Sequence, residues 1–243
     1  MKHEDKFYGL FNIKKPIIGM IHLAGWGEKE RVKRALEELA TYEDEGVNGA
    51  IIEDYHGNVH DVYNTLKEVF KSNFKIILGT NILRNPYLGL EWADEFGARF
   101  VQFDQIKSNK VSEGYHKFKR QEHSNLMILG GVRFKYTAPS GKSLEEDLDE
   151  GIRRCDAIVT TGEGTGIETP IEKLKSFKDY LGDFPLVVGT GLNVNNAYEQ
   201  LQIADGAIVG SSFKPNKDTY LPVDRFLVRE VMDVVKKIRG ENN

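Results

Sequence analysis

The sequence predicts a single-domain (β/α)8 barrel, the TIM-barrel fold, spanning residues 1–243. Eight short apolar runs alternate along the chain with segments of helical periodicity. The length of 243 residues is normal for this fold, and no Pro- or Ser-rich linker divides the chain. Two glycine-bearing turns near the C-terminus follow the last two runs, where barrels of this class often bind phosphate. An open doubly wound sheet, which also alternates strands with helices, is the alternative.

The first half of the chain contains four of the predicted strands. Residues 1–15 precede them as an N-terminal extension, which we expect to cover the bottom of the barrel. Short β-branched runs are typical of strands buried on both faces of a parallel sheet. The strands are predicted at Ile17–His22, Gly49–Glu53, Lys75–Gly79 and Phe100–Phe103. Apolar residues recur at helical spacing after the first three of them, at Val32, Ala35, Leu36 and Leu39, at Val62, Leu66, Val69 and Phe70, and at Leu88, Trp92, Ala93 and Phe96.

The second half continues the same alternation. Its strands are predicted at Leu126–Val132, Ala157–Thr160, Leu186–Val188 and Ala207–Val209. A helix over roughly 112–121 follows strand four, and a last helix places Phe226, Val231, Val234, Val235 and Ile238 on one side. Two caps are predicted from residue type. Asn85 should cap the helix that Pro86 opens, and Thr169 should cap a helix that starts near Pro170.

Composition excludes several classes of protein. A formal net charge of −4 and a pI near 5.9 argue against nucleic acid as a partner. Cys155 is the only cysteine, so no intrachain disulfide forms, and we expect its thiol to be buried. The first apolar run, Ile17–Leu23, is too short to span a bilayer and no signal-peptide cleavage site follows it. We therefore expect a cytoplasmic protein without a transmembrane segment.

Two glycine turns predict a phosphate site. Gly189, Thr190 and Gly191 follow strand seven, and Gly210, Ser211 and Ser212 follow strand eight. Glycine lets the backbone approach a ligand closely, and free amides in such turns form a nest for an anion. A phosphorylated small molecule is therefore the expected ligand.

Polar side chains at the other strand ends predict the catalytic groups, because the active site of a barrel gathers at the C-terminal ends of its strands. We assign catalysis to His22, Glu53 and Lys135, and favour Glu53 over its neighbour Asp54 as the side chain that enters the mouth. The predicted substrate-binding residues are Asn81, Arg84, Asp104, Arg133, Thr161 and Glu163. Two residues apart, Arg133 and Lys135 are expected to share one side of strand five as a cationic pocket. The structural alternatives are a buried histidine bonded to backbone and a pair of solvated loop acids.

No metal or cofactor is predicted. Glu53, Asp54 and Asp104 offer oxygen ligands of the kind that Mg²⁺ prefers, but nothing in their spacing demands a metal. His56 and His60 open a helix, where we expect them to be solvated. No G-x-S-x-G motif indicates a nucleophilic serine.

Seven segments, in order across nearly the whole chain, resemble the BtpA/SgcQ family of TIM-barrel proteins. They are KPIIGMIHLAG at 15–25, GVNGAIIEDY at 46–55, GTNILRNPY at 79–87, TTGEGTG at 160–166, VVGTGLNVNNA at 187–197, ADGAIVGSSFK at 204–214 and PVDRFLVREVM at 222–232. The resemblance implies a barrel with a phosphate-type site. It implies little about the reaction, since one branch is linked with photosystem I assembly and others with sugar-metabolism operons.

The chain departs from the family pattern at the catalytic face. The loop Leu23–Gly27 lacks the proline-rich LPPLPG type of turn, and the family's Glu-Asn pair at strand two becomes Glu53-Asp54. At strand five the family resembles ADVHVKHA, of which only Lys135 is kept; Gly131, Arg133 and Tyr136 replace an acid and two histidines. These changes indicate a substrate or activity different from that of relatives.

Taken together, these patterns predict an enzyme that acts on a phosphorylated metabolite such as a sugar or nucleoside phosphate. Acid–base chemistry of the isomerase, lyase or glycosidic-bond hydrolase type fits its residues. The alternative is a non-catalytic assembly or regulatory factor that binds a ligand or a protein. Barrels often pair through their outer helices, so we expect a homo-oligomer.

Overall fold

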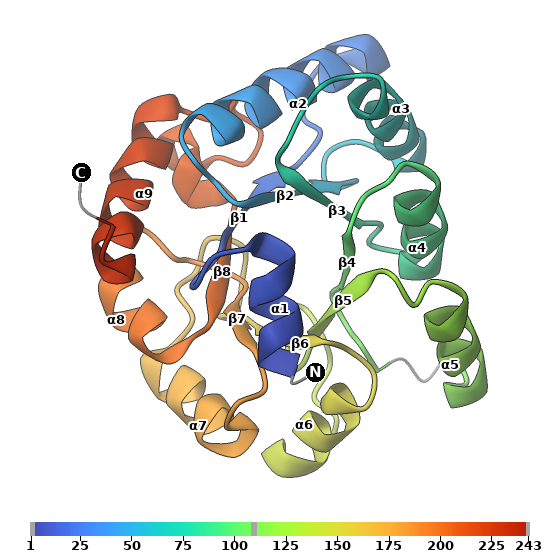
Figure 1. Cartoon of the computed structure of the whole chain (residues 1–243), viewed down its shortest axis with the longest axis vertical. Helices are drawn as coiled ribbons and strands as arrows, with labels where there is room; N and C mark the ends of the chain where they lie inside the picture. The colour runs from blue at the N-terminus through green and yellow to red at the C-terminus, as the bar shows by residue number, and fades with distance from the viewer. Residues whose placement is uncertain (1–2, 108–110, 242–243) are drawn as a thin grey trace.

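A computed structural model describes residues 3–107 and 111–241, which fold into a closed barrel of parallel strands ringed by helices (Figure 1). The strands pair in chain order and β8 closes on β1, so the predicted fold class is confirmed and the open sheet is wrong. The strands are β1 (Ile17–Ile21), β2 (Gly49–Glu53), β3 (Ile77–Asn81), β4 (Phe100–Phe103), β5 (Met127–Gly131), β6 (Ala157–Thr160), β7 (Leu186–Val188) and β8 (Gly206–Val209).

The helices follow the predicted alternation. They are α2 (Gly27–Asp44), α3 (Val59–Phe70), α4 (Pro86–Glu95), α5 (Glu113–Glu122), α6 (Leu144–Ile152), α7 (Ile171–Leu181), α8 (Ala197–Ile203) and α9 (Arg225–Arg239). Asn85 caps α4 through the amide of Leu88, as predicted. The predicted cap of α7 is wrong, because the Thr169 hydroxyl donates to the carbonyl of Thr190 instead.

Four strands differ from their predicted bounds: β1 ends one residue early, at Ile21, β8 begins one residue early, at Gly206, and β3 and β5 differ for identifiable local reasons. The strand predicted at Lys75–Gly79 begins at Ile77, because the Glu43 carboxylate accepts the amides of Lys75 and Ile76 at 2.6 and 2.9 Å. The strand predicted at Leu126–Val132 ends at Gly131, and Arg133 just beyond has a φ of +47°. A left-handed residue at that point breaks the alternation of side chains along the chain.

Side chains alternate between two apolar cores along every strand. Ile18 and Met20 of β1 face the barrel interior with Phe100 and Leu129, whereas Ile17 and Ile21 pack outward against the helices. A period of two carries the inward face of each strand on to its C-terminal end. The first polar side chains on that face form the mouth of the barrel.

The opposite end of the barrel is closed by α1 (His3–Phe11), which lies across the ring of strands in Figure 1. Phe7 and Phe11 of this helix are buried in the interior core. Their rings lie where Gly206 and Gly49 leave room at the first residues of β8 and β2. The extension before strand one therefore fills the bottom of the barrel.

The last helix holds the closing seam of the barrel. Arg239 of α9 donates to the carbonyl of Lys15 at 2.8 Å and to the Asn48 carboxamide oxygen. The same Asn48 oxygen accepts the amide of Ile17 at the start of β1. The C-terminal helix thus fixes the entry to the first strand.

Candidate functional site

Both glycine turns line one cavity at the mouth of the barrel. Neighbouring strands β7 and β8 carry them to it, since Val188 pairs with Ala207. The cavity is lined by Met20, His22, Glu53, Tyr55, Lys135, Thr165, Gly166, Gly189, Thr190, Gly191, Leu192, Ile208, Gly210, Ser211 and Ser212. The two turns therefore lie next to each other and line the same cavity, as the sequence predicts.

Four backbone amides of these turns are free to bind a ligand. Among the described residues, the amides of Thr190, Gly191, Ser211 and Ser212 have no hydrogen-bond acceptor. The amide of Gly189 differs, since it donates to the Thr160 carbonyl at 2.8 Å. Unpaired N–H groups that face one cavity are an anion-binding arrangement.

Gly191 has a specific steric reason to be glycine. Its φ is +75°, a conformation that favours glycine, and a Cβ would lie 2.3 Å from Cα of Glu168. The loop between β6 and α7 therefore crosses directly over this turn. The Thr190 hydroxyl accepts the amide of Gly162 at 2.8 Å and ties the two segments together.

His22 lies against the second turn. A Cβ on Gly210 would be 2.8 Å from Cε1 of His22, so the imidazole covers the Gly210 backbone. Nδ1 of His22 is buried and has no partner among the described residues. Burial, followed by the charges of Lys214, His56 and Lys135, holds the pKa of His22 well below its usual value. The imidazole is thus neutral at pH 7.

Glu53 belongs to a buried hydrogen-bond network. Asn81 Nδ2 donates to Glu53 Oε1 at 2.7 Å and to Asp104 Oδ1 at 2.9 Å, and Gln102 Nε2 donates to Asp104 Oδ1 at 2.7 Å. Burial and the neighbouring charge of Asp104 raise the pKa of Glu53 to about 8, although the Lys135 ammonium opposes them. Glu53 is therefore a protonated acid at neutral pH.

Lys135 lines the mouth from the loop after β5, not from the strand itself. It follows Arg133 beyond the end of β5, and its amide donates to the Thr161 hydroxyl at 2.6 Å. That hydroxyl also donates to the carbonyl of Gly162. Thr161, predicted to bind substrate, is thereby engaged with backbone.

Two tyrosines hold the β6–α7 loop over the mouth. The Tyr55 and Tyr136 hydroxyls lie 3.3 and 3.4 Å from Oγ1 of Thr165, and the amide of Thr165 donates to the Tyr136 hydroxyl at 3.0 Å. Tyr55 and Gln102 are not among the predicted site residues. Each lies two residues from a predicted acid, Glu53 or Asp104, on the same inward face, so the two-residue period of a strand could have identified them.

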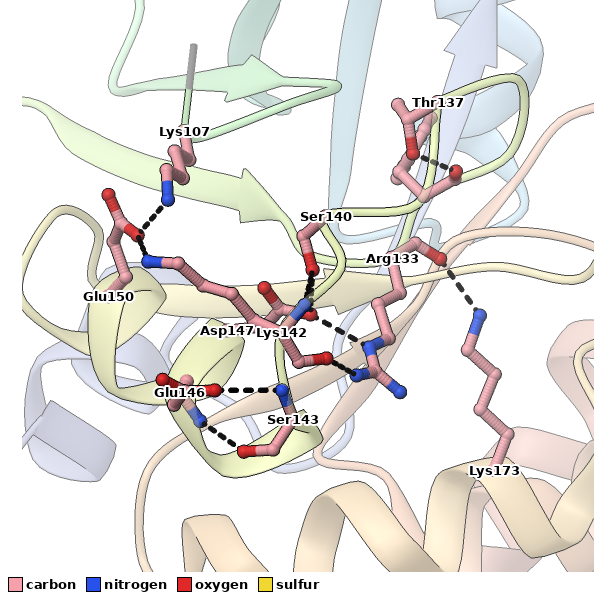
Figure 2. Close-up of polar contacts among 11 residues, drawn as sticks. Lys107, Arg133, Thr137, Ser140, Lys142, Ser143, Glu146, Asp147, Glu150 and Lys173 are labelled. Atoms are coloured by element: carbon pink, nitrogen blue, oxygen red, sulfur yellow. Dashed lines mark hydrogen bonds and ion pairs between the residues drawn. The ribbon is translucent and has the colours of Figure 1, made fainter. Parts of the chain in front are cut away.

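Arg133 does not share a face with Lys135, contrary to expectation. Figure 2 shows its guanidinium directed to α6, where Nε donates to Asp147 Oδ2 at 2.9 Å and Nη2 to the Lys142 carbonyl. Its own carbonyl accepts from Lys173. Arg133 therefore lines a second cleft, separate from the mouth cavity. This cleft has a volume of about 440 Å³ and lies between the residues that follow β4 and the β5–α6 loop. The positive φ at Arg133 is the reason for the separation.

Other strand-end residues also lie outside the mouth cavity. Arg84 and Glu163 are exposed, and Asp54 accepts the amide of Leu83. Lys214 is buried, with Nζ 3.0 Å from Glu38 Oε1 and 2.8 Å from the carbonyl of Leu221. A structural ion pair thus engages the lysine that follows the second glycine turn.

Three further side chains bear on the predicted chemistry. Asp54 points to the β3–α4 loop and leaves Glu53 and Asp104 without the third ligand considered for Mg²⁺. In the described ranges 3–107 and 111–241, no group of three His, Cys, Asp or Glu residues is placed to hold a metal ion. His56 is exposed and bonds Thr219, and Cys155 is buried behind α6, where its thiol donates to Gly151. Within the same ranges, no helix is both long and apolar enough to cross a membrane.

The family of the chain follows from residues 13–237, which match the model of the BtpA family. The chain belongs to the BtpA family. The photosystem I biogenesis protein BtpA of Synechocystis is 23% identical to it, over 93% of this chain and 89% of that protein. The putative sgc region protein SgcQ of Escherichia coli is 33% identical, over 69% of this chain and 67% of that protein. The predicted resemblance is confirmed.

Among solved structures, the N-(5'-phosphoribosyl)anthranilate isomerase of Pyrococcus furiosus has a similar fold. Its TM-score is 0.62 at 18% identity, with 92% of this chain and 99% of that chain covered. This likeness establishes the barrel architecture.

Proposed function

We propose that this chain is an enzyme that binds a phosphorylated small molecule and carries out acid–base chemistry on it. The observation that supports this most is the single cavity in which free amides of the two turns face His22, Glu53 and Lys135. An anion on the amides leaves the rest of the ligand beside these side chains. The isomerase of similar fold is named for a phosphoribosyl compound, which agrees with this ligand class.

The two environments divide the acid and base roles between Glu53 and His22. Glu53 carries a proton that it can donate to a carbonyl or leaving-group oxygen, because its pKa is raised to about 8. His22 is neutral because its pKa is lowered, and the neutral imidazole is the form that can act as the base. Titratable groups whose pKa values are pushed apart are the usual pattern of an acid–base pair. Lys135 stabilises the negative charge that develops, and Asn81 orients a hydroxyl group.

Turnover of a panel of phosphorylated sugars and nucleoside phosphates tests this function. We expect one panel member to react, and Glu53→Gln and His22→Gln each to lower kcat by about 10²-fold or more. The matched controls are Glu95→Gln and His60→Gln, exposed residues of α4 and α3, which should leave kcat unchanged.

The second candidate is a non-catalytic assembly factor. It is supported by the name of the Synechocystis relative and by exposed aromatic side chains in the loops after strands, with Trp26 84% and Tyr136 75% exposed. Saturable binding of a protein partner, together with no product from the panel, would favour this candidate over the enzyme. The homo-oligomer that the sequence predicts would be tested by sedimentation velocity of the wild-type chain.

A further inference from the structure

The second cleft, between the residues that follow β4 and the β5–α6 loop, takes no part in the proposed function. Its volume of about 440 Å³ lies within the range of cavities that hold small molecules. Among the described residues, the cleft and the mouth cavity share no lining residue, although Phe134 lines the cleft and the next residue, Lys135, lines the mouth. The cleft is therefore a separate space beside the C-terminal ends of β4 and β5.

The base of the cleft is fixed and apolar. The amide of Ile106 donates to the carbonyl of Gly131 at 3.1 Å and joins the two walls. A Cβ on Gly131 would collide with the backbone carbonyl of Asp104, so glycine lets the chain that leaves β4 pass close to the end of β5. Ile106 and Val132 keep 3% and 6% of their surface exposed where they line the cleft, and the exposed Ala138 of the β5–α6 loop adds to the apolar lining.

Hydrogen bonds hold the β5–α6 wall of the cleft in place (Figure 2). Asp147 of α6 accepts from Arg133 Nε and from the Ser140 hydroxyl, both at 2.9 Å. The Ser140 hydroxyl in turn accepts the amide of Lys142 at 3.2 Å, and Lys173 of α7 donates to the carbonyl of Arg133 at 2.9 Å. This wall is therefore preformed, so a ligand does not have to order it.

Three cations line the cleft with their side chains partly exposed. The side chains of Lys107, Arg133 and Lys142 are 32%, 41% and 41% exposed. The carboxylates that they contact, Asp147 and Glu150, are only 7% and 11% exposed. Because the cations are the more exposed partners in each pair, the cleft presents positive charge to solvent.

These cations keep N–H groups for a further acceptor. An ammonium has three donors and a guanidinium has five. Lys107 and Lys142 share one carboxylate oxygen, Glu150 Oε2, at 2.6 and 3.5 Å. Arg133 uses Nε and Nη2, and its Nη1 has no acceptor among the described residues. A carboxylate matches such donors in charge and geometry, and an apolar body attached to it matches the base of the cleft.

We infer that the second cleft is a binding site for a small organic carboxylate, separate from the phosphate site of the mouth. The ligand's carboxylate bonds the guanidinium of Arg133 and the ammonium groups of Lys107 and Lys142. Its apolar body covers Ile106 and Val132. Because the two spaces share no lining residue among those described, this site stands independently of the proposed function.

Isothermal titration with 2-naphthoate, 2-naphthamide and acetate tests this site. The amide has the shape of naphthoate without its charge, and acetate has the charge without the apolar body. The wild-type chain should bind 2-naphthoate at least about 10-fold more tightly than either, as one charge-assisted hydrogen bond and one buried ring predict. Arg133→Ala should weaken naphthoate binding at least about 10-fold and leave the Kd of inorganic phosphate unchanged.

Arg133→Ala also leaves the Asp147 carboxylate without its cation, so a second variant is needed. Ala138→Asp places a negative charge in the lining at an exposed position and should weaken naphthoate binding at least about 10-fold. Ala138→Ser, the matched control at the same position, should keep the wild-type affinity. Arg153→Ala removes an exposed arginine at the end of α6, outside the cleft lining, and should have no effect.

The outcomes separate this site from the mouth. Equal affinity for naphthoate and naphthamide, or unchanged naphthoate binding in both Arg133→Ala and Ala138→Asp, overturns the carboxylate site. Competition between phosphate and naphthoate, or loss of naphthoate binding in Lys135→Ala, locates the ligand in the mouth and also overturns it. Naphthoate binding by a chain that fails to bind phosphate supports the cleft and overturns the proposed phosphate site.

Discussion

The two ends of this barrel are built by opposite rules. At the bottom, α1 fills the opening with Phe7 and Phe11, whose rings are buried in the interior core. At the mouth, the same inward face carries a neutral histidine, a protonated glutamate and amides with unpaired atoms. The bottom contributes stability, whereas the mouth gives up stability to keep polar groups available. This contrast lets substitutions at the two ends be distinguished.

The largest expected effect is at the bottom. Phe7→Ala removes a fully buried ring and leaves a cavity, so the free energy of unfolding should fall by about 3–5 kcal/mol. Ligand binding at the mouth should persist while the chain remains folded. Urea unfolding measures the loss, with Phe70→Ala as control, because that ring is 64% exposed. Equal losses in the two variants would mean that α1 is not part of the core.

Glu53→Gln should raise the free energy of unfolding at alkaline pH, opposite to the effect of Phe7→Ala. The pKa of Glu53 is about 8 in the folded chain and 4.5 when unperturbed, so between these values the folded chain keeps a proton that the unfolded chain loses. Stability of the wild-type chain therefore falls as the pH rises through that window. Between about pH 5 and pH 9 the variant should gain on the order of 3 kcal/mol relative to wild type. Parallel stability curves from urea unfolding across this range would contradict the prediction.

Gly191→Ala tests the backbone part of the mouth. A Cβ there collides with Glu168, so the β6–α7 loop must shift and the anion should bind at least tenfold more weakly. The loss of stability should be about 1–3 kcal/mol. Gly97→Ala is the control, since its φ is +72° but nothing lies within 4 Å of an added Cβ. If the control is as unstable as Gly191→Ala, backbone strain alone accounts for the effect.

The smallest effect is expected for Arg133→Ala. Its ion pair with Asp147 is part-exposed, so the stability change should be about 0–1 kcal/mol. The Kd of phosphate should not change, because Arg133 lies in the second cleft, whereas Lys135→Ala should weaken binding. Calorimetric titration of phosphate into both variants measures the two Kd values. Weaker phosphate binding by Arg133→Ala would contradict the placement of this arginine outside the mouth cavity.

The sequence predicted the barrel well because apolar periodicity, glycine turns and chain length are local or global patterns. It also located His22, Glu53 and both turns, since the end of each strand is visible as the end of an apolar run. It failed at Arg133, where a single left-handed residue redirects the side chain, and it could not show that Lys214 pairs with Glu38, 176 residues distant. Neither a backbone dihedral angle nor a distant ion pair leaves a local pattern.

The bond from Arg239 to the carbonyl of Lys15 has a consequence for biosynthesis. Strand β8 completes the ring beside β1, and α9 secures the approach to β1 only once residue 239 has left the ribosome. A chain that ends before β8 leaves the edge of β1 unpaired, whereas a chain that contains β8 but ends just before Arg239 can pair β1 and lacks only the bond to Lys15. Pairing of the first strand and its fixation by α9 are therefore separate steps in the completion of the ring.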